Sequence, residues 1–204
     1  MTSATPPSRL KKLSADGRSI LFTDARTANS FSDTPVSIDE LIGIWELAKW
    51  APTSANGQPL RIVFVVTREG RERLLPHMMD MNKAKTASAP AVAILAADLN
   101  FHEHLPRLVP YKPEIKEAFA VEGIRHPSAQ FNAILQAGYF ILAIRAAGLA
   151  AGPMIGFSNA GVDADFFTGT TYRSVLVVNI GHPGESPWYD RLPRLDNEEV
   201  ISWA

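Results

Sequence analysis

The chain has 204 residues, 46% of them apolar and 20% charged, a balance typical of a globular domain with a sizeable core. Its formal net charge of −1 provides no basic field that would attract nucleic acid or an anionic membrane surface. Because the chain contains no cysteine, disulfides, thiolate metal sites and cysteine nucleophiles are excluded. This composition fits a reducing compartment, so we expect a cytoplasmic protein.

The N-terminal segment, residues 1–18, is predicted to be a flexible tail. Its first residues are small, proline-containing and basic, and no apolar run of the kind found in secretory signals follows them. Beyond this segment the chain contains no internal repeat, low-complexity stretch or long linker. We therefore expect one domain over residues 19–204.

The first clear elements lie before residue 80. Ser37 and Glu40 have the spacing of a capping box, which predicts a helix that starts at Ser37 and ends before Pro52. The β-branched and aromatic run at 61–67 then predicts a buried strand. A helix is expected to follow this strand over residues 68–78.

The longest apolar stretch runs from Ile134 to Leu149. Pro127 suits the first turn of a helix, and Gly148 is a typical C-terminal stop. We predict one helix over 127–147. Its apolar residues point in every direction: Phe131, Ile134, Leu135, Tyr139, Phe140, Ile141, Leu142 and Ile144. Gln136 and Arg145 interrupt this run, so a membrane span is not expected. Such a helix must be covered all round, either at the centre of a large core or in a subunit interface.

Two further apolar runs, at 90–97 and 172–180, predict buried strands. Helices and strands therefore follow one another without strict alternation. This order predicts an α+β sandwich with a central mixed sheet.

Motifs for hydrolysis and nucleotide binding are absent from the sequence, which has no Gly-x-Ser-x-Gly elbow, no Walker loop and no Gly-x-Gly-x-x-Gly fingerprint. His102 and His104, which flank Glu103, are the closest approach to a set of metal ligands. Two residues apart, they share a face only in a strand, whereas the surrounding residues predict a loop or a helix. We interpret them as solvated or substrate-side histidines and expect no metal.

Three polar segments, at 25–31, 52–59 and 152–157, have complementary chemistry. The first is basic and can hold a phosphate, and the second offers amide and hydroxyl groups for sugar hydroxyls and ring edges. The third is bounded by glycines, so its backbone can approach a planar ring closely. Taken singly, each segment is also consistent with ordinary capping and turn chemistry.

Together these segments resemble the flavin nitroreductase family, in which an Arg-Ser-x-Arg-type segment, a Pro-Ser/Thr-Ser-x-Asn segment and a Gly-x-Pro-like turn follow in this order. Arg26-Thr27-x-Asn29 is similar to the first, and residues 52–59 match the second most specifically. The resemblance runs from about Ser19 to the C-terminus. Residues 49–56 and 152–157 also resemble the subfamily that contains malonic semialdehyde reductases of pyrimidine breakdown.

The resemblance implies a homodimer with a nitroreductase-like, three-layer α+β sandwich, whose mixed, mostly antiparallel sheet is flanked by helices. Each subunit-shared site would hold one FMN. Arg26, Thr27 and Asn29 would contact its phosphate and ribityl chain, although the family usually has Arg or Lys in place of Asn29. One of Arg191 and Arg194 would also hold the phosphate.

Other positions are implied to surround the flavin ring. Asn82 and Lys85 match positions near its pyrimidine edge, where an ammonium group stabilises negative charge. The segment implied to lie along the ring consists of Pro153, Met154, Ile155 and Gly156. The residues implied to reach the flavin of the other subunit are Pro52, Thr53, Ser54 and Asn56.

The function that follows is hydride transfer from NADPH or NADH through flavin N5 to a small oxidised substrate, in a ping-pong cycle. The subfamily resemblance suggests malonic semialdehyde. A positive group suits its carboxylate, although a solvated loop is equally consistent with the same residues: His102, His104, Arg107 and Lys112. The alternatives are a nitroaromatic, quinone or dehalogenating reductase of the same family, and a flavin-binding module without turnover.

Overall fold

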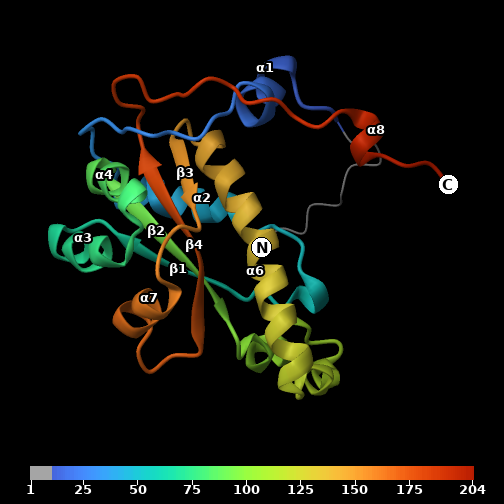
Figure 1. Cartoon of the computed structure of the whole chain (residues 1–204). Helices are drawn as coiled ribbons and strands as arrows, with labels where there is room; N and C mark the ends of the chain where they lie inside the picture. The colour runs from blue at the N-terminus through green and yellow to red at the C-terminus, as the bar shows by residue number, and fades with distance from the viewer. Residues whose placement is uncertain (1–10) are drawn as a thin grey trace.

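Four strands form the central sheet in the order β1-β2-β4-β3 (Figure 1). The computed structural model describes residues 11–204 of the chain. The strands are β1 (Leu60–Val65), β2 (Ala91–Asp98), β3 (Ala150–Met154) and β4 (Tyr172–Gly181). The three predicted strands are thus confirmed. The sequence predicted a mixed sheet, whereas every pairing between these strands is antiparallel.

The middle strand β2 is buried along its whole length and faces two separate cores. Ala93, Leu95 and Ala97 belong to the core beneath α2 and α6, whereas Val92 and Ile94 belong to the core beneath α3 and α7. The helices are α2 (Ile38–Ala48), α3 (Arg68–Leu74), α6 (Glu122–Ala146) and α7 (Asn159–Phe166). Because successive side chains of a strand point to opposite faces, one apolar strand serves both cores. The predicted three-layer α+β sandwich is confirmed.

The start of α2 follows the sequence signal closely. The Ser37 side chain accepts the N–H of Glu40, and the Glu40 carboxylate accepts the N–H of Ser37, which completes the predicted capping box. The helix predicted over 68–78 is shorter, since α3 ends at Leu74 and a 3₁₀ turn follows at Leu75–His77.

Helix α4 (Asp80–Ser88) was not predicted. Its only buried residues, Asn82 and Thr86, are polar, so the helix has no apolar periodicity to reveal it. In Figure 1 it lies on the same side of the sheet as α3 and α7.

The long helix α6 begins at Glu122, five residues before the predicted start. Pro127 lies inside the helix, so the prediction that it occupies the first turn was wrong. Its missing N–H and its ring affect only the bond to the residue four positions earlier, Gly123, at the very start of a 25-residue helix. At the other end, Gly148 has a φ of +77° and ends the helix as predicted.

Within one chain α6 is not covered on every side. Phe140 and Ile144 are buried in the core, whereas Phe131 is 71% exposed and Ile134 60% exposed. Leu135 and Tyr139 are also exposed. A row of large apolar side chains is therefore left on the solvent side of the helix.

The segment 152–157, predicted as a turn, contributes its first three residues to β3. Pro153 can occupy this strand because β3 pairs only with β4 and lies at the edge of the sheet, where a missing N–H is tolerated. The turn starts at Ile155, which is 78% exposed.

The remaining described helices are short: α1 (Ala15–Arg18), α5 (Leu105–Leu108) and α8 (Asn197–Val200). Most of the predicted tail, residues 1–10, lies outside the described residues, and α1 occupies its last part. In residues 11–204 no helix combines the length and the apolar character that a membrane crossing requires.

Candidate functional site

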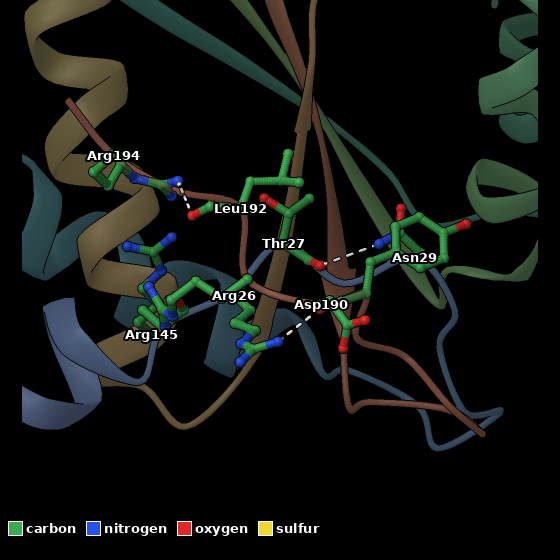
Figure 2. A pocket seen from close by; sticks show the side chains of 10 residues that line it. Arg26, Thr27, Asn29, Arg145, Asp190, Leu192 and Arg194 are labelled. Atoms are coloured by element: carbon green, nitrogen blue, oxygen red, sulfur yellow. Dashed lines mark hydrogen bonds between the residues drawn. The ribbon is translucent and has the colours of Figure 1, made fainter.

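A cavity of about 250 Å³ opens where the segment after α1 meets the C-terminal segment and the end of α6 (Figure 2). Its lining residues are Ala25, Arg26, Thr27, Asn29, Arg145, Tyr189, Asp190, Arg191, Leu192 and Arg194. This set includes Arg26, Thr27 and Asn29, which were predicted for the phosphate and ribityl chain, and both Arg191 and Arg194, one of which was predicted to hold the phosphate. We call this the arginine cavity.

The guanidinium groups of the arginine cavity are held by backbone oxygens. Arg26 donates to the carbonyl oxygen of Tyr189 at 2.6 Å, and Arg191 donates to that of Thr23 at 2.6 Å. Among the described residues none of the cavity's four arginines forms an ion pair with a carboxylate. Four arginines against one carboxylate, Asp190, in the lining leave an excess of positive charge that is suited to an anion.

Backbone hydrogen bonds tie the arginine cavity to the sheet. The N–H of Asn29 donates to the carbonyl of Pro187, so the N-terminal and C-terminal segments lie side by side. The N–H of Ala28, which is fully buried, donates to the carbonyl of Ala151 in β3. The Asn29 side chain donates to the carbonyl of Thr27, a local contact that orders the loop.

The turn after β3 is fixed by α4. The side-chain amide of Asn82 donates to the carbonyl of Gly156 at 2.9 Å, and the N–H of Met79 donates to the same oxygen at 3.0 Å. A Cβ on Gly156 would lie 2.5 Å from the Asn82 amide nitrogen, so the turn or the Asn82 side chain must shift if any other residue stands there. Asn82 is 5% exposed, and one of the two N–H donors of its amide is engaged with the turn.

Lys85 lies on α4 three residues after Asn82. It is partly buried and forms no ion pair within residues 11–204. Burial lowers the pKa of its ammonium group. An ammonium that loses hydration without gaining a carboxylate is available to a negatively charged ligand.

The loop at 52–58 has an unusual backbone. Ala55, Asn56 and Gln58 all have positive φ, at 52°, 51° and 45°. A positive φ is energetically costly for residues other than glycine, so surrounding contacts must enforce it. Residues in such strained conformations are concentrated at functional sites. Here Asn132 on α6 accepts the N–H of Ser54 at 2.8 Å.

The arginine cavity and the 52–58 loop do not meet within one chain. Both are attached to α6, the cavity through Arg145 and the loop through Asn132. These residues are thirteen positions apart, which is about 20 Å along a helix. Within one chain the residues predicted to bind the phosphate therefore lie together. Asn82, Lys85 and the turn at 153–156 lie apart from them. Another location is occupied by Pro52, Thr53, Ser54 and Asn56.

The positively charged residues predicted to bind a substrate carboxylate are dispersed. His102 is 7% exposed, and burial together with the charge of Arg125 lowers the pKa of its imidazole. His104 and Arg107 line a separate cavity of about 270 Å³, together with Arg61. Among the described residues no group of three or more histidine and carboxylate side chains could hold a metal ion.

The sequence analysis did not assign Arg145 to the site. It used this residue only as an argument against a membrane span. The signal was present, since Arg145 is an isolated charge near the end of a long apolar run. A buried charge in such a place needs a partner, and none is available on its own helix face.

Solved structures share this fold. A nitroreductase, provisionally named so, from Exiguobacterium sibiricum in complex with FMN superposes with a TM-score of 0.83 at 20% identity, covering 96% of this chain and 100% of that one. An enone reductase of gut-bacterial fatty acid saturation gives 0.80 at 19% identity, covering 93% of this chain and 98% of the other. The architecture is the nitroreductase fold.

The sequence comparisons narrow this result from fold to family. Residues 23–182 match the nitroreductase family. A Streptomyces coelicolor protein with the provisional name NADH dehydrogenase/NAD(P)H nitroreductase is 57% identical over 196 residues, 96% of this chain and 97% of the relative. The chain belongs to the nitroreductase family.

Proposed function

We propose that the protein is an FMN-dependent NAD(P)H oxidoreductase. The observation that carries this proposal is the arginine cavity, where four guanidinium groups converge without a carboxylate partner in the described residues. The name of the Streptomyces coelicolor relative supports the use of NADH or NADPH, and the structural relative from Exiguobacterium sibiricum binds FMN.

The residues present fit this cofactor. A phosphate suits the arginine cavity, because arginine forms paired, charge-assisted hydrogen bonds with phosphate oxygens. Gly156 has no side chain, and Asn82 and Met79 fill the space that a Cβ would take, so α4 can hold this turn closely. Lys85 adds a positive charge without a carboxylate partner among residues 11–204.

When bound, FMN supplies the hydride chemistry, in which NAD(P)H and the oxidised substrate use the same site in turn. The protein's residues bind and orient it. Arg26 and its neighbours hold the phosphate, and Asn82 keeps the turn in place through the carbonyl of Gly156. Lys85 stabilises negative charge at the edge of the ring.

We also propose a homodimer in which the site is shared. The exposed apolar row on α6, formed by Phe131, Ile134, Leu135 and Tyr139, supports a subunit contact, since obligate interfaces bury such surface. A shared site also gives the strained 52–58 loop a role that it cannot have within its own chain, about 20 Å from the arginine cavity along α6.

For the oxidised substrate we propose a small carbonyl compound with a carboxylate, such as malonic semialdehyde. Support comes from the cavity that His104 and Arg107 line. The names of the relatives favour a second candidate, a nitro compound. The cysteine-free composition supports activity in the cytoplasm.

The absorbance spectrum of the purified protein tests the proposal. Yellow protein that releases FMN, and not FAD, on denaturation is expected, and anaerobic NADH or NADPH should bleach it. A protein that binds FMN without being bleached would be a flavin-binding module. Colourless protein that takes up no added FMN would overturn the proposal, and rates with malonic semialdehyde, a neutral aldehyde of similar size and a nitroaromatic compound would identify the substrate class.

A further inference from the structure

Arg145 is the one residue of the arginine cavity that comes from a long helix. It lies in the last turn of α6, among side chains that pack into the core, such as Ile144. The other three arginines lie in segments without helix or strand, at 24–30 and 185–196. Arg145 is therefore positioned by the core of the protein, independently of these two segments (Figure 2).

The hydrogen bonds of Arg145 are incomplete. One terminal nitrogen donates to the carbonyl of Leu21 at 3.2 Å, whereas its Nε is buried and has no partner. Burial also lowers the pKa of the guanidinium group. No carboxylate among the described residues pairs with it.

This arrangement is costly unless an anion is present. A partly buried cation loses hydration, and the neighbouring Arg26 adds repulsion of like charges. A cation near the C-terminus of a helix gains from the helix dipole, but that gain requires neither burial of Nε nor a place in the cavity wall. A phosphate group bound in the cavity would compensate this charge.

We propose that Arg145 is a phosphate-binding residue of the cofactor site and determines the preference for a phosphorylated flavin over riboflavin. This inference rests on the proposed function. Because riboflavin lacks the phosphate, contacts of Arg145 contribute to FMN binding alone. The arginines on the two terminal segments close around the phosphate, and Arg145 provides the fixed side of the cavity.

The test compares Arg145→Gln with the wild type, with Arg145→Lys and with the exposed control Arg68→Gln. Fluorescence of flavin released from the holoenzyme on dilution gives the FMN dissociation constant, and reconstitution of flavin-depleted protein gives that of riboflavin. Arg145→Gln should weaken FMN binding by about 10- to 100-fold, the scale of a hydrogen bond to a charged group, and leave riboflavin binding within about twofold. Arg145→Lys should recover part of the loss, and Arg68→Gln should lose nothing.

Equal weakening of FMN and riboflavin binding in Arg145→Gln, together with a lower Tm, would mean that Arg145 only stabilises the end of α6, and would overturn the inference. A separate arm uses inorganic phosphate against sodium chloride at equal ionic strength, with Tm as the readout. Should the wild type bind no flavin, the proposed function fails, yet a phosphate-dependent rise in Tm that Arg145→Gln abolishes would still support the anion site. No phosphate effect in such a protein would overturn both.

Discussion

The side-chain oxygen of Asn132 accepts the backbone N–H of Ser54 at 2.8 Å and so fastens the 52–58 loop to the middle of α6. Asn132 is 5% exposed, and its amide nitrogen donates to the carbonyl of Ser128 at 2.8 Å. A second buried amide, Gln136, accepts the N–H of Leu60 at 3.0 Å just beyond the loop. Two amides on successive turns of α6 thus hold a backbone that includes residues with positive φ.

Replacing Asn132 with alanine should therefore lower the free energy of unfolding by about 1–3 kcal/mol, because the N–H of Ser54 is left without its partner. Thermal and urea unfolding measure the change. Ser128→Ala, which removes a hydroxyl that accepts only a long hydrogen bond of 3.4 Å from Asn132, should change the free energy of unfolding by less than about 0.5 kcal/mol. An unchanged stability in Asn132→Ala would show that the loop holds its own conformation.

Gly156→Ala should weaken FMN binding and stability together, because the new Cβ would lie 2.5 Å from the amide nitrogen of Asn82. Either the turn or the side chain must shift, and the hydrogen bond between them is lost. The matched control is Gly43→Ala in α2, where a Cβ meets nothing within 4 Å and where alanine should stabilise the helix by about 0.5–1 kcal/mol. Flavin fluorescence and Tm provide the two readouts, and full FMN affinity in Gly156→Ala would mean that the turn does not contact the ring.

Arg26→Ala should weaken FMN binding by about 1.5–3 kcal/mol, the scale of a hydrogen bond to a charged group. The same change removes the bond to the carbonyl of Tyr189 and frees the C-terminal segment. Fluorescence titration measures the affinity. Once saturated with FMN, the variant should be bleached by NADPH at the wild-type rate, and an unaltered affinity would place Arg26 away from the phosphate.

Ile134→Asp should disrupt the proposed dimer, because it places a charge in the middle of the exposed apolar row of α6. Light scattering during size-exclusion chromatography should show monomers that have lost flavin. Val66→Asp, an exposed position that follows β1 and lines a cavity with Arg68 and Arg71, is the control and should remain dimeric. A flavin-loaded monomer of the wild type at micromolar concentration would contradict the proposal directly.

Asp165 should contribute a pH-dependent part of the stability. Its hydrogen bond and ion pair with Arg73 hold the pKa of the carboxyl below its ordinary value, and His77 acts in the same direction. A lowered pKa in the folded state means that the contribution is complete above the pKa of the unfolded state, about 4, and is lost as the pH falls through the folded value. Asp165→Asn should therefore lower Tm at pH 7, and the difference from the wild type should shrink towards pH 3.

The Arg73→Gln variant separates this ion pair from other effects of the substitution. It removes the partner and leaves the carboxyl, so the stability that Asp165 adds at neutral pH should fall in this variant too. A difference between Asp165→Asn and the wild type that stays constant from pH 7 to pH 3 would show that the pair does not titrate with folding.

The elements that sequence predicted well are those with a local signal. Ser37 and Glu40 set the start of α2 through their own hydrogen bonds, and the apolar run of the fully buried strand β2 was sufficient to predict it. Helix α4 had no such signal, because its buried residues serve the turn after β3. The start of α6 was misplaced because Pro127 is tolerated inside the helix as well as in its first turn.

The candidate site was predictable only where a motif is continuous in sequence. Residues 26–29 and 191–194 were identified separately, and the fold brings them to one cavity. The membership of Arg145 depends on how α6 packs, and the positive φ angles of Ala55 and Asn56 depend on contacts with distant residues such as Asn132. Neither property is encoded in a short window of sequence.

Helix α6 carries the amide that holds the 52–58 loop, the exposed apolar row and one arginine of the arginine cavity. In a dimer built on this helix, subunit association and cofactor binding depend on the same rigid element. The free energies of dimerisation and of cofactor binding are therefore coupled. Linkage of this kind is reciprocal. Cofactor retention would then depend on protein concentration as well as on cofactor concentration, and cellular flavin supply would set how much of the protein persists as a paired species.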